Sequence, residues 1–72
     1  MTKKALEKLN DRQFYYCEQL SEIITRARKN GLKEEFEKKS GKLRGYLECL
    51  WHLDILTQTE MKSLYLYFMQ VK

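Results

Sequence analysis

A thiol, an imidazole and a carboxylate lie close together in one short segment, LECLWHLDIL, which spans residues 47–56. Cys49 and His52 are three residues apart, so they would be neighbours on a helix, and Asp54 follows two residues later. A zinc site needs four ligands, or three ligands and a water molecule. The one other cysteine, Cys17, is distant in the sequence, and no second Cys–His pair exists to complete a site. We therefore expect no metal ion and no cofactor.

Catalysis by the same segment is also disfavoured. A nucleophilic cysteine needs a base, a third group that orients the base, and a pocket. At about 100° per residue, Cys49 falls beside Leu53 at the edge of the leucine face of its helix, whereas His52 falls on the opposite side near Glu48. The reactive side chains do not converge on one point, so we predict a protein that is not an enzyme.

The chain is short and moderately basic. Its 72 residues make one domain, residues 1–72, with a formal net charge of +4. A chain of this size buries only about 60% of the surface of its unfolded form, so its core gains from self-association. The first residues lack the apolar stretch of a secretory signal, and the longest apolar run, residues 64–69, is too short to span a membrane. We expect a cytoplasmic protein, outside membranes, with both cysteines as thiols.

Two long helices follow from the spacing of apolar residues. From Leu6 onward these residues recur at steps of three and four, which predicts a helix over residues 3–29. Gly31 should stop this helix in the left-handed conformation that follows many helices. A second helix is predicted over residues 32–54. Its apolar residues keep their phase across Gly41 and Gly45, which favours one continuous helix, with a bend at these glycines as the alternative.

A third helix has the clearest local signal. Thr57 and Glu60 have the spacing of a capping box, and Leu56 and Met61 have that of a hydrophobic staple. These features predict a helix over residues 57–71. Its core-facing residues should be Met61, Leu64, Phe68 and Val71. The fold class is therefore all-α: a long antiparallel helical hairpin plus a shorter C-terminal helix, arranged as a three-helix bundle.

The predicted helices carry more large apolar side chains than one small core absorbs. The third helix is apolar on nearly all sides, and a surplus of this kind leaves an exposed patch of the sort that marks an interface. We therefore predict a non-enzymatic protein–protein interaction module, either an adaptor, a regulator or an inhibitor, that forms a homodimer and so a larger bundle. In size and composition it is similar in type to small inhibitors encoded by phages and mobile elements. The predicted interface residues are Phe14, Trp51, Tyr65, Leu66 and Met69.

A nucleic-acid-binding accessory protein is the alternative hypothesis. Basic residues gather along one face of the first helix and around the turn that follows it, where they could contact phosphates. Salt separates the two hypotheses, because phosphate binding weakens steeply between about 50 and 200 mM salt, whereas an apolar interface responds little. The predicted nucleic-acid contacts are Lys8, Arg12, Arg26, Arg28, Lys29 and Lys33.

Overall fold

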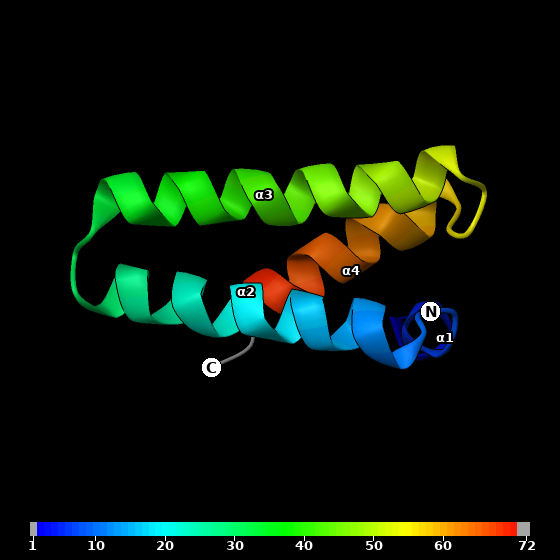
Figure 1. Ribbon diagram of the computed structural model, residues 1–72, viewed down its shortest axis with the longest axis horizontal. Helices are drawn as coiled ribbons and strands as arrows, with labels where there is room; N and C mark the ends of the chain where they lie inside the picture. The colour runs from blue at the N-terminus through cyan, green and yellow to red at the C-terminus, as the bar shows by residue number, and fades with distance from the viewer. Residues whose placement is uncertain (1, 71–72) are drawn as a thin grey trace.

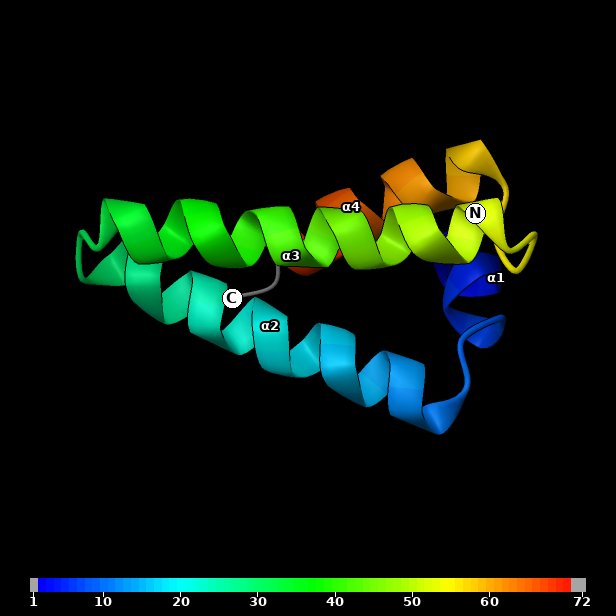
Figure 2. The same cartoon turned by 45° about the horizontal axis from the view of Figure 1, so that its top comes forward.

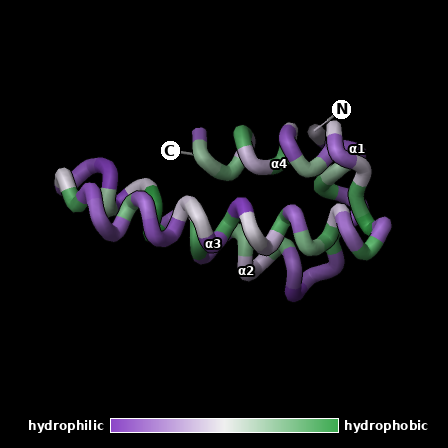
Figure 3. The backbone as a smooth tube through the Cα atoms, turned by 90° about the horizontal axis from the view of Figure 1, so that it is seen from above, coloured by the Kyte–Doolittle hydropathy of each residue, from purple (hydrophilic) through white to green (hydrophobic). Residues whose placement is uncertain are grey.

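The computed structural model describes residues 2–70, and within them every regular element is a helix, which confirms the all-α prediction. Helices α2 and α3 form a long antiparallel hairpin (Figure 1). Helix α4 crosses one side of this hairpin, and α1 lies beside the first turns of α4 (Figures 2 and 3). The molecule measures 34 × 20 × 20 Å. The four helices are α1 (Thr2–Glu7), α2 (Asp11–Lys29), α3 (Lys33–His52) and α4 (Gln58–Gln70).

The helix predicted over residues 3–29 is wrong in one respect, because it is divided into α1 and α2. Asn10 caps α2: its Oδ1 accepts from the Gln13 backbone N–H at 2.8 Å, and Gln13 Oε1 accepts from the Asn10 N–H at 2.9 Å. This capping box satisfies backbone donors that a new helix leaves without partners. Leu9 and Phe14 occupy the staple positions around it, and both pack in or against the core. The chain therefore turns at the Asn10 cap, although the apolar repeat continues on both sides of it.

The C-terminal ends of α2 and α3 are closed by the same hydrogen-bond pattern. After α2, the N–H groups of Gly31 and Leu32 donate to the carbonyls of Arg28 and Ala27, and Gly31 has φ 68°, as predicted. After α3 the pattern recurs with Asp54 in the left-handed position, at φ 62°. The second helix therefore ends at His52 and not at the predicted residue 54.

Two further predictions about the helices are confirmed. Helix α3 continues through Gly41 and Gly45, where an added Cβ would meet nothing within 4 Å. The capping box before α4 is present: the Thr57 N–H donates to Glu60 Oε1 at 2.9 Å, and the Glu60 N–H donates to Thr57 Oγ1 at 3.1 Å. The predicted end of this helix at Val71 lies outside the described residues.

The core lies where α4 rests on the α2–α3 hairpin. Two side chains of α2 hold the last described turn of α4. Ser21 Oγ donates to the Phe68 oxygen at 2.6 Å, and Arg28 Nη2 donates to the Met69 oxygen at 2.8 Å. On another side, α1 covers α4 and buries Ala5 completely. The largest fully buried side chains are Phe68, Ile24, Leu43, Leu47, Leu64 and Cys17.

Candidate protein-binding surface

The predicted interface residues do not share one exposed patch. Phe14, Trp51, Tyr65 and Met69 are partly buried and pack against the core. The Phe14 ring, for example, lies 6.1 Å from the Phe68 ring, centroid to centroid. Only Leu66 is well exposed, at 57%, in a groove between α3 and α4 that Arg44 and Lys62 flank. Most of the apolar surplus that motivated the prediction is therefore absorbed within the chain.

The predicted nucleic-acid contacts are likewise divided. Lys8 Nζ binds Glu60 Oε2 at 2.8 Å, and Arg28, besides its bond to α4, lies 5.9 Å from the centre of the Phe36 ring. Arg12 lies in the first turn of α2 and Arg26 near its end. At 1.5 Å per residue, these two positions are about 21 Å apart along the helix. All six side chains are exposed, and Lys29 and Lys33 lie beyond Arg26 in the turn region.

The two cysteine side chains differ in their exposure. Cys17 is fully buried, and desolvation raises its pKa to about 12, so the thiol is a small apolar core group. Cys49 is exposed, and His52 stacks on Trp51 with ring centroids 4.7 Å apart. Among residues 2–70, no three His, Cys, Asp or Glu side chains are grouped closely enough to hold a metal ion.

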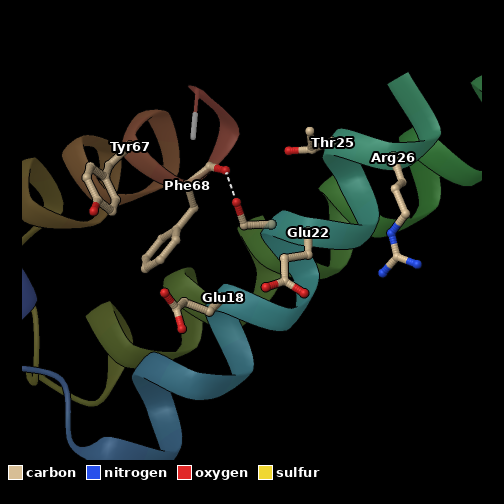
Figure 4. Close-up of a pocket in the computed structure, with 7 residues that line it drawn as sticks. Glu18, Glu22, Thr25, Arg26, Tyr67 and Phe68 are labelled. Atoms are coloured by element: carbon tan, nitrogen blue, oxygen red, sulfur yellow. Dashed lines mark hydrogen bonds between the residues drawn. The ribbon is translucent and has the colours of Figure 1, made fainter. Parts of the chain in front are cut away.

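A groove of about 380 Å³ lies between α2 and the end of α4 (Figure 4). Glu18, Glu22 and Arg26 line it from α2, and Tyr67 and Phe68 line it from α4. The bond from Ser21 to the Phe68 carbonyl crosses the groove, shown as a dashed line in Figure 4. The charged side chains of the groove all belong to α2 and are spaced four residues apart, so that Glu and Arg side chains are neighbours on the helix surface. This arrangement explains how α4 is held on α2 and provides no reactive centre.

A different surface remains open on the side of the hairpin that faces away from α4. On α2, the side chains that reach α4 include Phe14, Ser21 and Arg28. At about 100° per residue, Tyr16 lies roughly 160° around the helix from Phe14, so it faces away from α4. Figure 3 shows α4 and α1 on one side of the hairpin only. We call the opposite side, which is turned toward the reader in Figure 1, the hairpin face.

The centre of the hairpin face is apolar and aromatic. Tyr16 of α2 and Tyr46 of α3 meet across it with ring centroids 4.7 Å apart. Burial raises the pKa of Tyr46, and the neighbouring Cys17, Tyr16 and Cys49 side chains raise it further. Toward one end lies Leu53, which is 65% exposed, and toward the other a shallow groove that includes Ile23 and Leu32. The residues of this apolar centre are Tyr16, Ile23, Leu32, Tyr46 and Leu53.

The rim of the hairpin face is basic. By helical position it carries five basic side chains and one acidic side chain, Glu35. Lys39 is partly buried, the other four basic side chains are exposed, and none of the five makes an ion pair within residues 2–70. Unpaired charges of one sign give a surface a positive potential that attracts acidic partners. The basic rim consists of Arg12, Arg26, Lys38, Lys39 and Lys42.

Sequence reasoning missed this surface, although a signal for it is present. Tyr16 and Ile23 are seven residues apart on α2, and Tyr46 and Leu53 are seven residues apart on α3. A seven-residue spacing of apolar side chains is the mark of helices that pack against further helices. The four positions become one stripe only when α2 and α3 are placed side by side.

Comparison of the chain with protein-family models, curated proteins and solved structures finds no match. No helix within residues 2–70 is both long enough and apolar enough to cross a membrane. The function of the chain is therefore inferred from its own surfaces.

Proposed function

We propose that this chain is a non-enzymatic helical interaction module that binds another protein through the hairpin face. The observation that carries the proposal is the exposure of Leu53, at 65%. Helical position puts Leu53 on the same side of the hairpin as Tyr46, which contacts Tyr16, and no helix within residues 2–70 covers that side. An exposed apolar stripe with a polar rim is the usual composition of a protein interface.

The size of the hairpin face also supports protein binding. The face extends over the two longer dimensions of the molecule, 34 by 20 Å. This corresponds to roughly 700 Å², close to the ~800 Å² per partner of a standard interface. One partner of ordinary size would therefore occupy the whole hairpin face.

Self-association, which we predicted from the sequence, is less favoured at this surface. A two-fold dimer places a surface against its own copy, so the basic rim would face a second basic rim. The prediction was also based on the need to cover a second side of the third helix, and α1 covers α4 within the same chain. Molecular mass measured at two protein concentrations tests for a homodimer directly.

Capture experiments in the cells that produce the protein test the proposal. The wild-type chain should retain a partner protein that Leu53→Ser loses, because this change removes the most exposed apolar side chain of the hairpin face. Leu66→Ser, in the groove between α3 and α4, is the matched control and should retain the partner. Loss with Leu66→Ser alone would place the interface in that groove and contradict the proposal.

Nucleic-acid binding remains the second candidate function, because the basic rim and two tyrosines share the hairpin face. Phosphate contacts and aromatic stacking together suit single-stranded nucleic acid. This alternative predicts that retention is abolished by nuclease treatment and weakens steeply with salt. Retention that survives both treatments supports a protein partner.

A further inference from the structure

We infer that the partner of the hairpin face is an acidic amphipathic helix of about 20 residues, packed along that face over α2 and α3. The inference rests on the proposed function and adds the chemistry of the partner. It is drawn from the length of the hairpin face, the spacing of its apolar side chains and the charge of its rim.

The hairpin face has the length of a helix. Helices α2 and α3 contain 19 and 20 residues and run antiparallel, and they diverge toward the end of the hairpin where α1 lies (Figure 2). At 1.5 Å per residue, the face that they form is about 30 Å long, which is the length of a 20-residue helix. On its opposite side, the same pair of helices already receives α4. A partner helix would therefore pack on the hairpin in a way the chain itself already uses.

The apolar side chains are spaced for a helix to lie across them. The pairs Tyr16–Ile23 and Tyr46–Leu53 repeat after seven residues, and Tyr16 and Tyr46 meet where the two helices face each other. A partner with apolar residues at steps of three and four would place one side chain against each of these positions. The two ends of the hairpin face, at Leu53 and at Leu32, are its most exposed apolar points, at 65% and 52%.

The charge of the rim determines the sign of the partner. In packed helices the residues that flank the apolar seam select the partner, because like charges placed opposite each other are unfavourable. On the hairpin face these flanking residues are basic on both helices, with Arg12 and Arg26 on α2 and Lys38 and Lys42 on α3. A helix with Glu or Asp beside its apolar seam satisfies them, and a basic helix does not.

The same geometry favours a protein helix over a nucleic acid. Nucleic acids bind tyrosine by stacking a base on a free ring face. The Tyr16 and Tyr46 rings instead pack on each other at an interplanar angle of 60°, so each covers part of the other. In addition, Leu53 and Ile23 present aliphatic groups on the hairpin face, and these groups make no favourable contact with a phosphate backbone.

Selection from a peptide library tests the inference on the intact 72-residue chain. The displayed probes are helical 21-residue peptides with leucine fixed at the seam positions and Glu, Lys, Gln or Ala varied elsewhere. We expect the selected pool to gain Glu and lose Lys relative to the input. Selected peptides should bind at least tenfold more weakly to Leu53→Ser and to Lys42→Glu. They should bind equally well to the charge-matched control Lys62→Glu on α4, and circular dichroism should show all three variants folded.

The outcomes separate the two proposals. Peptides that depend on Leu53 but show no acidic enrichment would overturn the acidic partner and leave the proposed function standing. A pool with no dependence on Leu53 would overturn both. A 20-nucleotide single strand or a 20-base-pair duplex that binds more tightly than the best peptide at 150 mM salt, and that depends on Lys42 but not on Leu53, would identify nucleic acid as the ligand and overturn both.

Discussion

Two buried serines, Ser21 and Ser40, donate equally short hydrogen bonds to backbone carbonyls, yet we expect their replacement by alanine to have different effects. Ser21 Oγ reaches the Phe68 oxygen across the α2–α4 contact at 2.6 Å, and Ser40 Oγ reaches the Phe36 oxygen within α3 at 2.7 Å. The Phe36 carbonyl lies in the interior of its helix and keeps a backbone N–H partner without the serine. The Phe68 carbonyl instead accepts from a side chain of a different helix, so the Ser21 bond joins α2 to α4.

The size of the difference follows from this contrast. Ser21→Ala removes this hydrogen bond between two helices from a buried site, at a cost of about 0.5–1.5 kcal/mol. Both substitutions gain about 0.5 kcal/mol in helix propensity, so this gain cancels between them. Ser21→Ala should therefore be less stable than Ser40→Ala by about 0.5–1.5 kcal/mol. For a domain of this size, that corresponds to a Tm lower by roughly 2–12 °C.

Thermal and urea unfolding, followed by circular dichroism at one protein concentration, measure the difference. Ser21→Thr serves as a second control, because it restores the donor. Equal Tm values for the two alanine variants would refute the reasoning, since they would show that the last turn of α4 does not depend on Ser21.

Three further predictions concern other parts of the chain. Asn10→Ala should lower the free energy of unfolding by about 1 kcal/mol, measured by urea unfolding, and Asn10→Ser should restore most of it; no loss would mean that the cap does not stabilise the start of α2. At pH 8, a thiol reagent such as DTNB should label the exposed Cys49 of the native protein rapidly. The buried Cys17, with its pKa of about 12, should stay unlabelled until urea is added. Equal labelling rates for the two thiols would place Cys17 outside the core. The hydrogen bond from Lys8, together with that from the Thr57 N–H, lowers the pKa of Glu60. The carboxylate therefore stabilises the fold at pH values above its unfolded pKa, and this stabilisation is lost as the pH falls through the folded pKa. Glu60→Gln should therefore be less stable than wild type at pH 7 and equally stable at pH 2.5 in urea unfolding; the same deficit at both pH values would exclude the charge as its cause.

Local signals in the sequence predicted the helix ends well where we applied them. Thr57 and Glu60 form the expected capping box, and Gly31 takes the expected left-handed conformation. Both depend on contacts between residues a few positions apart, which are the same in any fold. Asn10 and Gln13 satisfy the same capping rule, and we missed the break after α1 because the apolar repeat continues in phase on both sides of it.

The candidate site was harder to predict than the helices. Trp51, Tyr65 and Met69 were predicted at an interface; they are partly buried and pack against the core, so their place at an interface stays a prediction. The surface that remains open is defined by Tyr16 and Leu53, which belong to different helices. No helical wheel drawn for a single helix shows that they share a face.

The sequence by itself determined the all-helical class, the turn after α2 and the start of α4, because apolar spacing, glycine and capping residues act over one or two helical turns. Only the tertiary structure decided which apolar side chains are buried and where the basic residues gather. Those properties depend on which side of the hairpin α4 occupies and on how α1 folds back over it. They are set by contacts between residues far apart in the chain, such as Ser21 with Phe68 and Tyr16 with Tyr46.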